Sequence, residues 1–280
     1  MSLSSWIAAR FKHLIYPRVK DVRGAWRLRH TLDSISLRKE PRRTGTPESI
    51  FEAGDWDNLL ILDDCRYDTY KEVTGRDGSR TSLGSCTLEF IRKTFGDGDF
   101  SDTVYVTANP HLHASQFETK TGRTAEETFA EVKHLYLTDW DDEAGVVLPS
   151  TVRERAVEAR EEHPEKRMIV HFMQPHVPLL VSDLTPERTV STEEAASIES
   201  DSLSVMARAE LGEVEESTVR TAYRRNLEAV MEEVDPLVEQ LPGKTVITSD
   251  HGELLGEGGR YGHPCRMDLE ILRKVPWDER

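Results

Sequence analysis

The sequence predicts an α/β protein: a three-layer sandwich with a largely parallel central sheet and helices on both faces. Short runs rich in Val and Ile recur along the chain, and each is of strand length and apolar nearly throughout, as strands buried on both faces are. Stretches with helical spacing of apolar residues separate these runs. This order of strand, helix and strand favours parallel pairing with right-handed crossovers. The 280 residues are enough to bury a sizeable core.

The N-terminal segment differs from the rest of the chain. Residues 1–43 hold eleven lysines and arginines against three acids, in a chain of formal net charge -15. Apolar residues recur among these cations at roughly helical spacing: Trp6, Ile7, Phe11, Leu14 and Ile15. We therefore expect residues 1–45 to form a basic arm and residues 46–280 a single catalytic domain. The arm either docks on the acidic body of the protein or meets an anionic membrane surface or partner, and the sequence leaves both open.

Four apolar runs supply the expected strands, and two longer stretches supply helices. The runs are 58–63 (NLLILD), 103–109 (TVYVTAN), 167–173 (RMIVHFM) and 244–250 (KTVITSD). Residues 150–164 open with a Ser/Thr cap and end at proline, whereas residues 217–243 keep helical spacing until Pro242 and Gly243 stop them. Residues 183–216 are polar and acidic, and we expect a helical excursion or a flap over one edge of the sheet there.

Charge and cysteine content narrow the class of protein. With 51 Asp and Glu against 36 Lys and Arg, the body of the chain is too acidic for general nucleic-acid binding, and this pattern suits a salt-rich, halophilic cytoplasm. Three cysteines, an odd number, cannot all pair within the chain and give no reason to expect a disulfide framework, so a reducing compartment is the simpler interpretation. No apolar run reaches the ~20 residues that span a bilayer. We therefore expect a cytoplasmic protein, peripheral to the inner face of the membrane if the arm binds there.

Polar residues end the expected strands. In an open parallel sheet, ligands bind beyond the carboxyl ends of the strands, which places Asp63, His176, Asp250 and His251 at a common rim. Carboxylates with neutral imidazoles suit zinc or manganese, since magnesium and calcium sites use oxygen alone. Burial of a charge beside an imidazole is costly unless something pairs them. The sequence therefore predicts a divalent metal site at this rim.

Four segments resemble one superfamily. Residues 249–264 (SDHGELLGEGGRYGHP) resemble the signature of the alkaline phosphatase and sulfatase superfamily, and are especially similar to the ends of phosphoethanolamine transferases and lipoteichoic acid synthases. Residues 60–68 (LILDDCRYD), 83–90 (LGSCTLEF) and 173–179 (MQPHVPL) agree with that family in order. The segments span most of the chain beyond the arm. The resemblance implies an alkaline phosphatase-like fold and ester chemistry at a metal centre.

The resemblance also implies roles for individual residues. Thr87 becomes the nucleophile, and the metal ligands are Asp63, Thr87, Asp250, His251 and His263. His176 and His263 would bind substrate oxygens, hold a second cation or protonate the leaving group. The fallback nucleophiles are Ser82, Ser85 and Cys86.

Other polar residues near these segments have less definite roles. Arg66 would clamp a substrate oxygen, although an ion pair with Asp68 is an equal alternative. Glu253 and Glu257 are expected beside the ligands or in solvent. At the end of its strand Asn109 could face the cleft, whereas His111 and His113 are expected in a solvated loop.

The chain departs from the superfamily pattern at three points. Cys86 is followed by TLEF and not by the Pro-x-Arg that accompanies formylglycine in sulfatases, which argues against a formylglycine sulfatase. Gln174 stands where two-zinc enzymes carry an Asp, so a second metal site would be weak or missing. The transferases are anchored by transmembrane helices, and because no run here supplies one, lipid-linked substrates do not follow from the match.

These features predict an enzyme, a metal-dependent hydrolase or transferase of phosphomono- or diesters that works through a covalent phosphothreonine. A dication stabilises the alkoxide of an otherwise poor nucleophile. Zn²⁺ or Mn²⁺ is expected, with one firm site and a second left open, and the substrate would be a small or lipid- or glycan-linked anionic ester. Sulfate esters are the alternative substrate. A non-catalytic, metal-stabilised binding module recruited by the basic arm is the alternative class of protein.

Overall fold

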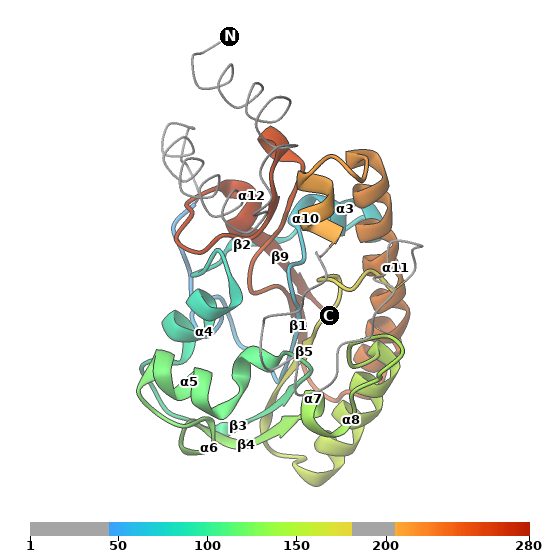
Figure 1. Ribbon diagram of the computed structural model, residues 1–280. Helices are drawn as coiled ribbons and strands as arrows, with labels where there is room; N and C mark the ends of the chain where they lie inside the picture. The colour runs from blue at the N-terminus through green and yellow to red at the C-terminus, as the bar shows by residue number, and fades with distance from the viewer. Residues whose placement is uncertain (1–44, 181–204) are drawn as a thin grey trace. The chain divides into compact units, whose positions relative to one another are not determined.

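A seven-stranded sheet forms the centre of the structure, in the order β2–β9–β6–β1–β5–β3–β4 (Figure 1). The structure is a computed structural model and describes residues 45–180 and 205–280. Residues 1–44 of the expected basic arm, and residues 183–204 of the expected excursion, therefore lie outside the described residues. Within the described ranges no helix is both long and apolar enough to cross a membrane.

The four expected strands are confirmed and are neighbours in the sheet. They are β6 (Thr245–Thr248), β1 (Asn58–Leu62), β5 (Arg167–Phe172) and β3 (Phe100–Thr107), and every neighbouring pair is parallel. Parallel pairing brings their carboxyl ends to one edge of the sheet. The predicted rim therefore exists as a structural feature.

Three further strands, which the apolar runs did not predict, complete the sheet. Strand β4 (Phe129–His134) extends the parallel part beside β3. Strand β9 (Lys274–Glu279) runs antiparallel to β6 and also pairs with β2 (Ser79–Thr81). A separate hairpin of β7 (Leu254–Leu255) and β8 (Tyr261–Gly262) lies within the C-terminal signature segment.

Helices cover both faces of the sheet. The expected helices over 150–164 and 217–243 are confirmed as α8 (Pro149–Glu162) and α11 (Glu216–Gln240). The remaining helices of the described part of the chain are α3 (Tyr67–Thr74), α4 (Thr87–Phe95), α5 (Ala114–Thr121), α6 (Ala125–Thr128), α7 (Leu135–Thr138), α10 (Val205–Glu210) and α12 (Glu270–Arg273), with short 3-10 turns η4 (Pro110–Leu112) and η5 (Glu257–Gly259).

Alternating side chains of the strands build two cores. On one face Leu60 and Leu62 of β1 pack with buried residues of α8 and α11, such as Ala156 and Val230. On the other face Leu59 and Ile61 pack with Phe90, Phe95 and Phe117 of α4 and α5. Figure 1 shows α8 and α11 on one side of the sheet and α4 and α5 on the other. The chain is thus an α/β three-layer sandwich, as predicted.

Candidate metal centre

Buried acidic and imidazole side chains meet at the carboxyl edge of the parallel strands. Asp63 and Asp64 follow β1, and Asp250 and His251 follow β6. All four are at most 1 % exposed. Asp64 takes a left-handed backbone conformation with φ 69°, which Asp tolerates better than most residues, and both carboxylates of the pair therefore reach the site. The sequence prediction of a common rim holds, with Asp64 as an additional member.

One cluster joins the predicted ligands Asp63, Asp250 and His251 to the hydroxyl of Thr87. The Nε2 atom of His251 lies 3.0 Å from Thr87 Oγ1, 3.3 Å from Asp250 Oδ2 and 3.8 Å from Asp63 Oδ1. These two carboxylate oxygens are buried without a hydrogen-bond partner. Ligand atoms about 2.0–2.2 Å from a tetrahedral zinc ion lie about 3.3–3.6 Å from one another. The spacing and the orphaned oxygens fit a divalent ion held by these four side chains.

A second cluster lies beside the first and gathers the predicted His263 and His176. The Nδ1 atom of His263 is 3.1 Å from Asp64 Oδ1 and 3.0 Å from Glu253 Oε2. His176 Nε2 is 4.0 Å from Asp64 Oδ2. Because Asp64, His251 and His263 also come close enough to hold an ion, this cluster could take a second cation. Gln174 donates its Nε2 to the carbonyl of Val147, and its Oε1 is buried without a hydrogen-bond partner.

The opposite face of His251 is held by the backbone and by Asp64. Its Nδ1 is 3.0 Å from the carbonyl of Gly252 and 2.9 Å from Asp64 Oδ1. In the neutral ring, a proton on Nδ1 donates to the Gly252 carbonyl and leaves the Nε2 lone pair directed at Thr87 and the Asp63–Asp250 pair. Metal-bound histidines are usually oriented in this way, by a carbonyl or carboxylate on the second nitrogen.

Asp63 is oriented by residues that the sequence did not single out for this role. Asn109, which was expected to face the cleft, donates its side-chain amide to Asp63 Oδ2. His171 is fully buried in β5, with Nε2 4.0 Å from Asp63 Oδ2 and Nδ1 3.0 Å from the hydroxyl of Tyr105. Burial lowers the pKa of His171 to about 4, so this ring is neutral. The sequence signal that could have identified His171 is an ionisable residue inside the apolar run 167–173.

Thr87 is the first residue of α4 and is 4 % exposed. Its hydroxyl lies in the positive field of a nine-residue helix, which favours an anion there. The fallback nucleophiles are engaged elsewhere: the hydroxyl of Ser82 donates to the Asp250 carbonyl, and that of Ser85 lies 3.0 Å from the Pro264 carbonyl. Cys86 is in a disulfide. Of the four candidates, Thr87 is the one whose hydroxyl contacts the ligand cluster.

A tight turn brings His263 back to the rim. The β7–β8 hairpin pairs Leu254 with Gly262, so the chain reverses within nine residues of Glu253. Gly256 adopts φ 115°, and a Cβ there would collide with the carboxylate of Glu216. Gly256 therefore accounts for part of the glycine content of this segment.

Arg66 takes the ion-pair alternative and does not face the metal ligands. Its Nη2 lies 2.6 Å from Asp68 Oδ2, and its Nη1 lies 2.8 Å from Glu257 Oε1 and 3.1 Å from the carbonyl of Glu253. The expectation that Arg66 clamps a substrate oxygen is therefore corrected, because the guanidinium is buried and its donors are used to fix the turn after β7.

The expectation that His111 is solvated is also corrected, since burial lowers its pKa and its Nδ1 contacts Gln116.

Three side chains elsewhere have metal-like spacing, namely Glu131, Glu162 and His163. They lie on the surface, and the ammonium of Lys133 is 3.2 Å from Glu131 and 2.5 Å from Glu162. The lysine supplies the positive charge that an ion would otherwise provide. This group is better described as an ion-pair network.

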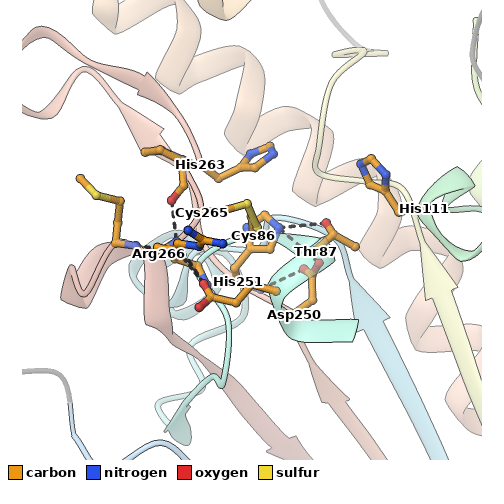
Figure 2. The surroundings of a disulfide bond; sticks show 12 residues. Cys86, Thr87, His111, Asp250, His251, His263, Cys265 and Arg266 are labelled. Carbon is orange, nitrogen blue, oxygen red and sulfur yellow. Dashed lines mark hydrogen bonds and ion pairs between the residues drawn. A yellow bond between two sulfur atoms is a disulfide. The ribbon is translucent and has the colours of Figure 1, made fainter. Parts of the chain in front are cut away.

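Two cysteines are paired, contrary to expectation. Cys86 and Cys265 form a disulfide across 179 residues of sequence with a Cα–Cα distance of 5.1 Å (Figure 2). Cys65 is free and buried. An odd number of cysteines leaves one unpaired but does not prevent one pair. The inference of a reducing compartment from the cysteine count is therefore wrong.

The electrostatics of the metal-free site favour bound protons. Burial and the neighbouring Asp250 carboxylate raise the pKa of Asp63 well above its usual range, and burial and Asp64 raise that of Glu253 to about 8. Burial alone would lower the pKa of His251, but Asp250 and Asp64 raise it to about 9. Asp64 is the opposite case, since His263 and His251 outweigh its burial and lower its pKa. Without metal, bound protons therefore balance the buried negative charge that a metal ion would otherwise compensate.

These shifts predict that the metal-free protein loses stability as pH rises from about 6.5 to 9. Glu253 and His251 bind protons more tightly in the folded chain than in the unfolded chain, so the stabilisation is complete below their ordinary pKa values and is lost through their raised values. Metal binding displaces the same protons, and the apparent metal affinity should therefore rise over this range. Thermal midpoints with and without zinc check this, and a Glu253→Gln chain should show a smaller slope. A metal-free midpoint that rises with pH would contradict the assignment.

Comparison with known proteins supports the fold but no narrower assignment. No family model matches the sequence, and no curated protein does. Lipooligosaccharide phosphoethanolamine transferase A from Neisseria meningitidis, an integral membrane protein, matches 98% of this chain with 13% identity and a TM-score of 0.53. The soluble domain of that transferase matches 82% of this chain and 78% of its own, with 15% identity and a TM-score of 0.50. The chain has the alkaline phosphatase/sulfatase-like fold. It spans 58% of the length of the membrane transferase.

The expectation of a cytoplasmic protein is wrong. The transferase matched over 98% of this chain is an integral membrane protein. The disulfide points the same way, because disulfides persist in oxidising compartments. The inference of a salt-rich cytoplasm from the acidic composition is left without support.

Proposed function

We propose that this chain is a metal-dependent hydrolase or transferase of phosphoesters that works through a covalent phosphothreonine on Thr87. One observation carries the proposal: the Thr87 hydroxyl lies 3.0 Å from His251 Nε2, at the point where Asp63 and Asp250 each leave a buried oxygen without a partner. A buried, orphaned carboxylate pair beside a hydroxyl is costly without a cation. We further propose that residues 46–280 form a single catalytic domain.

Asp63, Asp250, His251 and Thr87 would hold the metal ion, and Zn²⁺ or Mn²⁺ suits this mixture of oxygen and nitrogen ligands. When bound, the ion would stabilise the Thr87 alkoxide and offset the negative charge of the phosphoryl group. Asp64 and the Gly252 carbonyl keep His251 turned toward that position. His263 would be a ligand of a second cation or a proton donor, according to the charge on its ring.

The chain's own residues then divide the reaction between them. Thr87 Oγ1 forms a bond to phosphorus as the bond from phosphorus to the leaving oxygen breaks, and the Thr87 proton passes to solvent. His263, whose pKa Asp64 and Glu253 raise despite its burial, carries a proton for the leaving oxygen. His176 is neutral, because burial lowers its pKa to about 4, and its one proton lies on Nδ1, which donates to the Val177 carbonyl at 2.7 Å. Its Nε2 would therefore offer a lone pair to a second cation. Water or a second alcohol then attacks the phosphothreonine and releases Thr87.

Phosphoesters are favoured over sulfate esters by the state of Cys86. The formylglycine of sulfatases is made from a cysteine at the position of the nucleophile, and the cysteine nearest Thr87 is held in a disulfide. We further propose that the substrate carries its ester on a lipid or glycan, in line with the transferase named for lipooligosaccharide. Residues 1–43 would contact anionic membrane near such a substrate.

Turnover of three chromogenic esters by the metal-loaded protein tests the proposal. We expect p-nitrophenyl phosphate or bis(p-nitrophenyl) phosphate to be cleaved with Zn²⁺ or Mn²⁺, p-nitrophenyl sulfate to be cleaved at least about 10²-fold more slowly, and chelation to abolish the activity. A protein that binds one equivalent of metal tightly and cleaves none of the esters would instead favour the binding-module alternative. Preference for the sulfate would overturn the choice of substrate.

A further inference from the structure

The Cys86–Cys265 disulfide joins the two segments that carry Thr87 and His263. Cys86 directly precedes Thr87, and Cys265 lies two residues after His263 (Figure 2). Thr87 belongs to the first cluster, around Asp63, and His263 to the second, around Asp64. The bond therefore links the proposed nucleophile to the proposed proton donor.

Cys86 controls the orientation of Thr87 through the start of α4. Its carbonyl accepts hydrogen bonds from the amides of Glu89 at 3.1 Å and Phe90 at 3.0 Å, which form the first turn of the helix. Gly84, two residues earlier, lies so close to the Phe90 backbone that a Cβ would collide with it. A displacement of Cys86 would therefore move the Thr87 hydroxyl with the helix end.

The segment around Cys265 has little else to hold it. Cys265 and Arg266 are exposed, and Pro264 and Met267 are only partly buried. Its polar attachments go largely to the residues beside Cys86: the Pro264 carbonyl lies 3.0 Å from the Ser85 hydroxyl, the Met267 amide 3.1 Å from the same hydroxyl, and the Arg266 amide 3.2 Å from Glu89 Oε2. Hydrogen bonds to a partly exposed surface are individually weak. The disulfide is the one covalent tie between the two segments.

The core and the first cluster do not depend on this segment. Asp63, Asp250 and His251 follow buried central strands, and their polar contacts are to one another, to Asn109, Thr87, His171 and Asp64, and to the backbone. The contact with the Cys265 segment is the ring of His263, whose centroid lies 4.6 Å from that of His251. The two principal apolar clusters contain neither Cys86 nor Cys265. Cleavage of the bond should therefore release the His263 segment while the fold and these three metal ligands remain.

We propose that the Cys86–Cys265 disulfide positions Thr87 and His263 for phosphoryl transfer, so that its reduction switches the enzyme to a slow state without loss of the fold. This inference rests on the proposed function. Cys265 is exposed, so a reductant in solvent can reach the bond. With a phosphine, the S–S bond breaks to two thiols, the phosphine is oxidised to its oxide, and water supplies the oxygen and both protons. Cys86 and Cys265 are positioning residues here and do not touch the substrate.

The test compares the oxidised full-length chain with the same chain reduced by tris(2-carboxyethyl)phosphine, a Cys265→Ser chain and a Cys65→Ala chain. Misplacement of a reacting group by about 1 Å can slow a reaction on the order of 10²-fold. We expect reduction to lower kcat by at least about tenfold and up to that amount, with bound zinc and far-ultraviolet circular dichroism unchanged. The Cys265→Ser chain should be equally slow and insensitive to the phosphine. The Cys65→Ala chain should respond as the wild type does, which excludes Cys65 as the target.

Reoxidation distinguishes a disulfide that positions the reacting groups from one that merely stabilises the fold. Reoxidation of the reduced wild type should restore kcat, whereas a chain that had merely unfolded would lose its zinc and its circular dichroism together. Equal kcat in the oxidised and reduced states would overturn the role of the disulfide and leave the proposed function intact. An oxidised chain that turns over no phosphoester would refute the proposed function, and this inference with it.

Discussion

The Thr87→Ala protein is expected to lose at least about 10³-fold in kcat, as removal of a nucleophile does in covalent catalysis. Thr87 Oγ1 is the hydroxyl that lies 3.0 Å from His251 Nε2, and alanine has no oxygen to replace it. Metal should still bind through Asp63, Asp250 and His251, since their orphaned oxygens and ring nitrogen are untouched. Steady-state kinetics and metal analysis of the purified chain check both parts.

A matched Thr87→Ser protein is the control, because it keeps a hydroxyl at the same place. It should retain measurable turnover, slower than the wild type if the lost methyl group lets the hydroxyl rotate away. Full activity in Thr87→Ala would transfer the role to Ser82 or Ser85, whose hydroxyls now contact the carbonyls of Asp250 and Pro264. That result would remove the basis of the mechanism.

The Asp63→Asn protein is expected to be more stable than the wild type without metal and less stable than the wild type with metal. Without metal, it should be more stable than the metal-free wild type by about 1–3 kcal/mol near pH 8. The folded wild type must either keep an ionised carboxylate buried beside Asp250 or take up a proton that the unfolded chain does not bind, and a neutral amide of similar shape incurs neither cost. The raised pKa of Asp63, caused by burial and Asp250, is the structural sign of this penalty. The amide oxygen can still accept the hydrogen bond from Asn109.

With metal, the order should reverse. Zinc at about 1,000 times its Kd stabilises a folded protein by about 4 kcal/mol, and a chain that lacks one carboxylate ligand loses most of this at the same concentration. Chemical denaturation of both proteins, with zinc and with chelator, measures the four free energies of unfolding. If the metal-free variant proved less stable than the metal-free wild type, or if zinc stabilised both alike, Asp63 would not be a buried metal ligand.

The parallel centre of the sheet could be predicted because burial leaves a direct mark on composition. Strands β1, β3, β5 and β6 are covered on both faces, so they read as continuous apolar runs. Strands β4 and β9 do not: β4 is partly exposed at the edge of the sheet, and β9 carries Asp278 and Glu279 in the sequence KVPWDE. Their pairing depends on neighbours distant in the chain, which local patterns do not record.

The candidate site was predicted less completely than the fold, for geometric reasons. Along a regular strand successive side chains alternate between faces, so Asp63 and Asp64 would be expected to diverge. The left-handed backbone of Asp64, with φ 69°, cancels this alternation at the strand end and turns both carboxylates to the rim. Contacts such as Arg66 with Glu257, and the disulfide across 179 residues, arise from tertiary folding alone.

The mass of the protein after acid quenching tests the central claim most directly, because it asks whether phosphorus becomes attached to Thr87. Metal-loaded wild type mixed with bis(p-nitrophenyl) phosphate and quenched within its first turnovers should carry the mass of one bound phosphoryl ester, and fragmentation should place it on Thr87. The Thr87→Ala protein, treated alike, should carry none. An unmodified wild type that nevertheless releases product, or an adduct on any other residue, would contradict the account.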